Sequence, residues 1–186
     1  KGIVLTEKQK DKLKRKWEQG LIKARVKALL WHNAEKQKRL DTAKNRALGV
    51  LKKIDDKYSA VLELALAFLY LGEGNKRTKE TALASSDPEI LKFFLASVQK
   101  IFGINPNTVR YELNLRVDQD PRAMISFWSK TLGVPARCFK RVSTDQRSRG
   151  SKTYNYYKGV CYVRCMPVAI QRELVYLARL YSEKII

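Results

Sequence analysis

The sequence predicts an α+β domain, with a largely antiparallel sheet and its helices on one face, preceded by a basic helical arm. Two observations lead to this prediction. After about residue 58, segments with the 3.6-residue period of a helix alternate with segments that have the two-residue period of a strand. Before it, residues 1–57 hold 18 basic and 7 acidic side chains and show only a thin apolar face. We therefore divide the chain into an arm, residues 1–57, and a domain, residues 58–186.

The arm is predicted to be helical throughout. Thr6-Glu7-Lys8-Gln9 reads as a capping box that opens a helix through about Gln19, where Gly20 interrupts it. A second helical pattern covers residues 21–54, which contain no proline. Two interpretations remain open: a solvated arm or short coiled coil, and an arm that follows phosphates, with a degenerate helix-turn-helix around Gly20.

The domain is predicted to begin with an unusually apolar helix, residues 58–72. Between Val61 and Leu71 the only charge is Glu63, so this helix must be buried in a core or against a second copy of itself. Gly72 and Gly74 are expected to stop it, since glycine enters the left-handed conformation easily. A short strand follows at residues 80–85.

The later elements are marked by caps and alternation. Asp87 and Pro88 open a helix that reaches residue 102, where Gly103 ends it, and Asp120 opens another that reaches residue 132. Residues 108–117 alternate apolar and polar side chains, as a strand with one buried face does. Two strands near 137–143 and 159–165 and a helix over 167–181 complete the order.

Composition favours a polyanionic partner. The formal net charge is +20 and the pI is about 10.0, which suits DNA or RNA, with an anionic membrane surface as the main competitor. We expect no membrane partner, because the longest apolar run is too short to span a bilayer. Three cysteines without a CxxC pair suit a reducing cytoplasm, and a single histidine makes a multi-histidine metal site impossible.

Glu73 is a lone carboxylate at the end of the apolar helix. The negative end of the helix dipole disfavours a carboxylate there unless a cation compensates, and a divalent metal or a basic partner is that cation. The alternative is a solvated side chain paired with Lys76 or Arg77. Lys76, Arg77 and Lys79 either lie near bound backbone phosphate or form an ordinary basic turn.

A second basic region spans residues 137–164, with interleaved tyrosines. Its loop, Ser148-Arg149-Gly150-Ser151-Lys152, has the composition of a flexible segment that becomes ordered on phosphate. Arg110 and Arg116 alternate on the predicted strand and are expected to read bases, unless they are merely solvated. The nucleic-acid-binding residues predicted in this region are Arg137, Lys140, Arg141, Arg147, Arg149, Lys152, Tyr154 and Lys158.

The segment from Leu66 to Gly74 resembles the motif of the LAGLIDADG homing-endonuclease superfamily, with Glu73 at the position of the metal-binding acid. The segments 82–94 and 127–135 also look similar to that family. The resemblance covers about residues 58–182 and implies a Mg²⁺-dependent or other divalent-metal-dependent DNA endonuclease, with Glu73 as catalytic metal ligand. One motif per chain implies a homodimer on double-stranded DNA, in the cytoplasm of a bacterium or phage and associated with the nucleoid. The implied dimer interface comprises Ala65, Phe68, Leu69 and Gly72.

Two positions depart from the motif. Leu71 stands where its first acid usually is, and Phe68 stands where a small residue usually lets two helices approach. Whether the protein cleaves DNA therefore stays open. The alternatives are a catalytically inactive regulator of the same fold and an RNA-binding protein, either maturase-like or part of a ribonucleoprotein.

Overall fold

The computed structural model describes residues 5–55, 59–164 and 167–186. The chain divides into two units, Lys1–Asp55 and Asp56–Ile186, which we call unit 1 and unit 2. Each unit is described by itself. The predicted boundary at residue 57 and the last residue of the predicted strand 159–165, Cys165, lie outside the described residues.

Unit 1 is one long helix, α1, from Glu7 to Leu51. Its start confirms the predicted capping box, since the Thr6 backbone N–H donates to Gln9 Oε1 at 2.9 Å. The predicted interruption at Gly20 is wrong, because the helix continues through this residue. One glycine costs only about 1 kcal/mol relative to alanine, and residues of good helical propensity on both sides outweigh that cost. No residue of α1 is buried.

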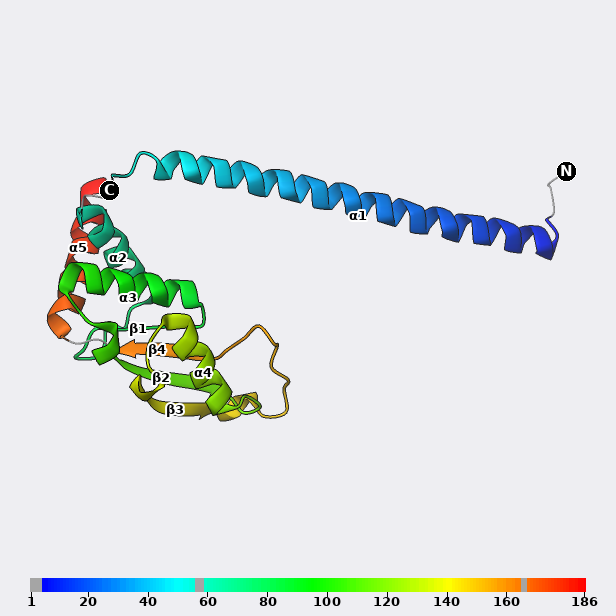
Figure 1. The fold of residues 1–186 in the computed structure, drawn as a ribbon. Helices are drawn as coiled ribbons and strands as arrows, with labels where there is room; N and C mark the ends of the chain where they lie inside the picture. The colour runs from blue at the N-terminus through cyan, green and yellow to red at the C-terminus, as the bar shows by residue number, and fades with distance from the viewer. Residues whose placement is uncertain (1–4, 56–58, 165–166) are drawn as a thin grey trace. The chain divides into compact units, whose positions relative to one another are not determined.

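Unit 2 confirms the α+β prediction, and Figure 1 shows its elements. Short 3-10 turns cover Pro106–Thr108, Ala136–Cys138 and Gln146–Ser148. In chain order the longer elements are α2 (Ser59–Glu73), β1 (Ala82–Ser85), α3 (Pro88–Phe102), β2 (Arg110–Arg116), α4 (Pro121–Leu132), β3 (Phe139–Asp145), β4 (Val160–Arg164) and α5 (Val168–Ile185).

The sheet has the strand order β1-β4-β2-β3 and is mixed. β4 pairs antiparallel with both β1 and β2, in line with the largely antiparallel sheet that was predicted. β2 and β3, however, are parallel. The reason is α4, which lies between these strands in sequence and returns the chain so that β3 runs in the same direction as β2.

The helices cover one face of this sheet (Figure 1). On that face β2 contributes the buried residues Tyr111, Leu113 and Leu115, and β4 contributes Cys161 and Val163. Buried side chains of α2, α3, α4 and α5 belong to the same cluster. On the opposite face β2 carries only polar side chains, and the neighbouring strands add Arg164 and Tyr162 together with Ala82, Ala84 and Val160.

Only one side of α2 is buried. Leu66, Ala67 and Tyr70 are fully buried, whereas Val61, Ala65, Phe68 and Gly72 are exposed. The expectation that this apolar helix is enclosed on nearly every side is therefore wrong for a single chain. The exposed positions recur at spacings of four, three and four residues, so they form one continuous face of the helix.

The glycines that end α2 act differently from the prediction. Neither Gly72 nor Gly74 adopts a positive φ, whereas Gly103 and Gly133, which end α3 and α4, do. Gly74 is needed for space, since a Cβ there would lie 2.5 Å from the Tyr70 carbonyl oxygen and 2.6 Å from its ring. The close packing of Tyr70 on the chain that leaves α2 thus requires glycine.

Candidate nucleic-acid interface

The helix-free face of the sheet is lined by polar side chains. The registers of the strand pairs place Arg110 beside Arg164, Glu112 beside Tyr162 and Arg116 beside Asp145. Both predicted base readers, Arg110 and Arg116, therefore lie on this face, at opposite ends of β2. The same face carries Asn114, Arg141 and Ser143.

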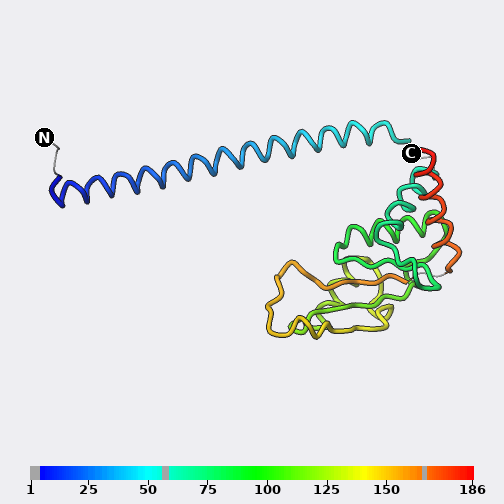
Figure 2. The backbone as a smooth tube through the Cα atoms, turned by 180° about the vertical axis from the view of Figure 1, so that it is seen from behind, coloured from blue at the N-terminus to red at the C-terminus, as the bar shows by residue number. Residues whose placement is uncertain are grey.

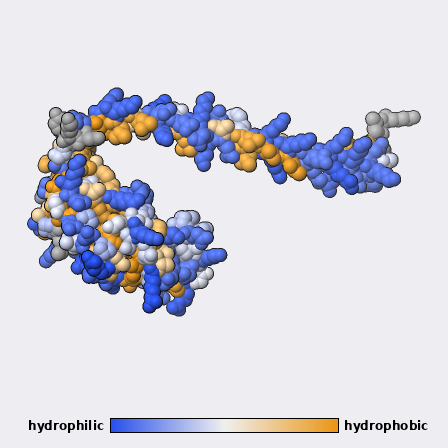
Figure 3. All heavy atoms as spheres, viewed as in Figure 1, coloured by the Kyte–Doolittle hydropathy of each residue, from blue (hydrophilic) through white to orange (hydrophobic). Residues whose placement is uncertain are grey.

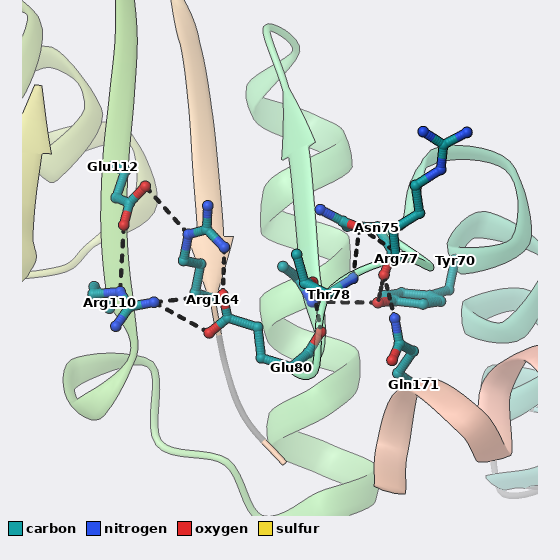
Figure 4. Close-up of polar contacts among 10 residues, drawn as sticks. Tyr70, Asn75, Arg77, Thr78, Glu80, Arg110, Glu112, Arg164 and Gln171 are labelled. Atoms are coloured by element: carbon teal, nitrogen blue, oxygen red, sulfur yellow. Dashed lines mark hydrogen bonds and ion pairs between the residues drawn. The ribbon is translucent and has the colours of Figure 1, made fainter. Parts of the chain in front are cut away.

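Arg110 belongs to a closed ion-pair network at one end of the face (Figure 4). It lies 3.1 Å from Glu80 Oε2 and 3.4 Å from Glu112 Oε1. Arg164 binds the same two carboxylates, one of them by a very short contact to Glu80 and the other at 3.2 Å to Glu112. The two arginine charges are thus balanced by two carboxylates, which makes Arg110 a poor candidate for reading bases.

The network also shifts the titration of Arg164. Partial burial acts to lower the pKa of Arg164, but the hydrogen bond to Glu80 and the charges of Glu112 and Glu80 outweigh this effect and raise the pKa. The guanidinium therefore stays charged and holds β4, β2 and the segment before β1 together. We assign it a structural role.

The other end of β2 anchors the loop between β3 and β4. Val117 N–H donates to Ser148 Oγ at 2.9 Å, and Arg116 Nη2 donates to Ser151 Oγ at 2.6 Å. Thr153 N–H donates to Asp118 Oδ2 at 2.7 Å, and the Thr153 hydroxyl donates to the same carboxylate. These bonds tie the loop to the end of β2, and its ordering on phosphate stays a prediction.

The titration of Asp118 reflects this anchoring. The Thr153 hydroxyl, followed by the Thr153 N–H, donates hydrogen bonds that lower the pKa of Asp118. Because Asp118 lies two residues after the end of β2, the loop is tied to the end of the sheet face.

The loop presents two stacked aromatic rings. Tyr154 and Tyr156 lie with ring centroids 5.4 Å apart and nearly parallel, and they are 72% and 80% exposed. Beside them, Arg116 and Lys152 line a hollow of about 350 Å³. Figure 2 shows the loop extending beyond the strands. Exposed tyrosines next to cations offer both stacking surfaces and phosphate contacts.

The remaining predicted cations fall into two groups. Arg147 forms a two-pronged pair with Asp145 at 2.9 and 3.1 Å, and this bonding raises the pKa of Arg147. Arg149 donates to Gln146 at 3.3 Å, and Lys158 Nζ lies 5.7 Å from the centre of the Phe127 ring. The second group lies on and before β3 and is exposed, as Arg147 and Arg149 also are: Arg137, Lys140 and Arg141.

Glu73 is the last residue of α2 and is exposed. Among the described residues it has neither a hydrogen bond nor an ion pair through its side chain. Lys76 instead donates to the carbonyl oxygens of Leu71 at 2.8 Å and Gly74 at 3.1 Å. Lys76 thereby caps the negative end of the helix, which is a use the sequence did not reveal.

A metal site within one chain is not found in the described part. No group of three or more His, Cys, Asp or Glu side chains there could hold an ion. Glu73 alone supplies one carboxylate. Carboxylate oxygens are ligands that suit Mg²⁺.

A basic groove beside α5 was not predicted from the sequence. Its volume is about 380 Å³, and Lys76, Arg77 and Lys79 line it together with Arg172 and Arg179 of α5. No acidic side chain lines it. Arg172 and Arg179 are seven residues apart, which places them on one face of a helix. That spacing and the basic turn of residues 76–79 were visible in the sequence, but their packing side by side was not.

No protein-family model, curated protein or solved structure matches the chain. Among the described helices, none has both the length and the apolar character needed to cross a membrane. The features that bear on function are therefore those of unit 2 itself. It is an α+β unit with a polar sheet face, a basic loop that carries tyrosines, a basic groove, and an apolar helix with one exposed side.

Proposed function

We propose that unit 2 binds double-stranded DNA through the helix-free sheet face and the anchored loop 146–158. The observation that carries this proposal is the series of exposed cations on the edge strand β3 and on the loop that follows it. Lys140 and Arg141 are exposed at the start of β3. Lys152 is exposed beyond its other end, beside Arg116 and the stacked tyrosines. Such side chains contact phosphates and base edges in DNA complexes.

In this proposal the protein acts as a homodimer, arranged as in the LAGLIDADG family. Its interface is the exposed face of α2, including Ala65, Phe68 and Gly72. An exposed apolar helix face on a folded unit marks an interaction surface. Tyr181 of α5 enlarges this surface, since its ring packs edge-on against Phe68 with the ring centroids 5.9 Å apart. Leu69 is half-buried against the core, so it borders this interface and does not centre it.

Phe68→Asp tests the dimer. The aspartate would place a charge on the apolar face, so sedimentation equilibrium should show at least a tenfold weaker dimer at unchanged helix content. Glu173→Lys, an exposed substitution on α5, serves as the control. If unit 2 of the parent chain stays monomeric at every concentration that can be measured, this arrangement is refuted.

If the protein is a nuclease, a divalent metal would lie between two Glu73 carboxylates, one from each chain. Bound Mg²⁺ would activate water and stabilise the leaving oxygen of a phosphodiester. One observation favours the alternative, a DNA-binding regulator without catalysis. Lys76 already supplies a cation to the end of α2, so the helix does not depend on a metal for compensation.

Two experiments separate these functions. Competition between duplex DNA and structured RNA at one salt concentration comes first, because so basic a chain binds any polyanion; preference for RNA would replace the DNA proposal with an RNA-binding function. Cleavage of a duplex library with Mg²⁺ then compares the parent with Glu73→Gln. Equal cutting by both would remove Glu73 as metal ligand, and tight duplex binding without cutting would identify the regulator.

A further inference from the structure

The helix α1 carries an apolar stripe that no other part of unit 1 covers. All of its large apolar side chains remain accessible, and Ile22, Leu29 and Val50 are about 60% exposed. Figure 3 shows these side chains as patches along one side of the helix. A helix gains most of its stability in water by burying such a face, so the stripe calls for a partner.

The stripe has the period of a coiled coil. Its positions alternate by four and three residues, which gives 3.5 residues per turn and predicts left-handed supercoiling with a partner helix. Two of its nine side chains are polar and the others are apolar. The positions are Ile22, Val26, Leu29, Asn33, Lys36, Leu40, Ala43, Ala47 and Val50.

We propose that residues 22–50 of two copies of this chain pair as a parallel, in-register coiled coil. This contact is independent of the proposed DNA binding and of the α2 interface. It involves only unit 1. The occupant of the stripe is thus a second α1, and the orientation follows from the side chains that flank the stripe.

The flanking charges exclude the antiparallel arrangement. One flank carries Arg25, His32, Arg39 and Arg46, so three of its four positions are cationic. The other flank carries Lys23, Leu30, Gln37, Lys44 and Leu51. In an antiparallel pair the first flank meets itself, so arginine would face arginine. In a parallel pair each flank meets the other, five residues further along, and only Arg39 against Lys44 repels.

Asn33 sets the register. It occupies an a-type position, where a single asparagine bonds to its counterpart across a parallel seam and disfavours shifted pairings. In this register Arg25 and Arg46 lay their aliphatic stems against leucines of the partner. Both features depend on identical helices running side by side, which supports a second copy over an unrelated helix.

The same sequence limits the strength of the pair. Lys36 places a charge in the seam, and residues 22–50 contain eight basic and two acidic side chains. The helices therefore repel at long range, and added salt should screen this repulsion. Pairing of α1 is expected to strengthen with salt, whereas binding to nucleic acid weakens with salt. The opposite salt responses separate a failure of this proposal from a failure of the proposed function.

Cysteine cross-linking of the full chain tests the geometry. Ile22→Cys and Val50→Cys should each form a disulfide-linked dimer with itself under mild oxidation, while Lys38→Cys on the outer face and the parent chain should not. Self-linking at both 22 and 50 requires parallel helices in register. Linking at one position only, at neither, or equally at Lys38→Cys would overturn the proposal.

A second variant gains the interaction, so misfolding cannot imitate it. Lys36→Leu completes the apolar seam and should lower the dimer dissociation constant more than tenfold in sedimentation equilibrium. Lys38→Leu makes the same chemical change on the outer face and should leave the constant within twofold of the parent. Equal effects of the two substitutions would show that the stripe is not a specific seam and would refute the pairing.

Discussion

Gly74→Ala should destabilise unit 2, although it exchanges glycine for a residue of better helix propensity. The added Cβ would meet the Tyr70 carbonyl oxygen at 2.5 Å and the Tyr70 ring at 2.6 Å. Tyr70 cannot move aside easily, because its side chain is fully buried and its hydroxyl donates to the Asn75 carbonyl at 2.8 Å. Overpacking of this kind costs about 1–3 kcal/mol.

Gly72→Ala, two residues earlier and inside α2, provides a control. Nothing lies within 4 Å of a Cβ at Gly72, so the substitution should stabilise the unpaired unit by about 0.5–1 kcal/mol. The two glycines therefore predict free-energy changes of opposite sign. For a unit of this size we expect Gly74→Ala to lower the midpoint of thermal unfolding by roughly 3–10 °C.

Urea unfolding followed by tryptophan fluorescence measures both variants. Trp128 is fully buried in unit 2, whereas Trp17 and Trp31 of α1 are mostly exposed, so the spectral shift reports mainly on unit 2. The measurement belongs at concentrations where the chain is monomeric. If Gly74→Ala proves as stable as the parent, or follows Gly72→Ala, the steric explanation for this glycine is refuted.

Three further outcomes are expected. Arg172→Glu combined with Arg179→Glu reverses charge in the basic groove and should weaken duplex binding at least tenfold in fluorescence anisotropy. The control Lys184→Glu should change the affinity little. Equal losses of affinity in the two variants would show that the groove has no specific role in binding. The hydrogen bonds that lower the pKa of Asp118 stabilise the loop above the ordinary value of 3.8, and this stability is lost as pH falls through the lower folded value. The protection of the loop amides from exchange, relative to an unstructured chain at the same pH, should therefore be unchanged from pH 7 to 5 and fall only in strong acid, while Asp118→Asn lowers it at neutral pH. Deleting residues 1–54 should lower affinity and its salt slope without altering sequence preference; lost preference with an unchanged slope would mean that the arm reads bases.

Local sequence signals predicted most elements of unit 2. Asp87 and Asp120 cap α3 and α4 as expected, since each accepts hydrogen bonds from N–H groups in the first turn. The alternation of residues 108–117 correctly identified the buried face of β2. These predictions succeeded because caps and period-two patterns act within a few residues.

Long-range contacts account for what the sequence did not predict. The carboxylate of Glu80 that engages Arg110 lies thirty residues earlier in the chain, and the loop anchors near Asp118 lie about as far apart. The crowding at Gly74 depends on a ring orientation that only the packed core defines. Alternation could show that Arg110 and Arg116 share a face, but it could not show that Arg110 shares two carboxylates with Arg164.

The strand order has a consequence for how unit 2 is made. β1 is an edge strand whose neighbour in the sheet is β4, and α2 packs extensively against α5. During synthesis the first helix and strand of the unit must therefore wait until its last strand and helix have left the ribosome. Pairing over such separations is slow. During synthesis the apolar helix α2 is thus formed before α5, the helix that covers its buried side. Removal of α5 should leave that side of α2 exposed permanently.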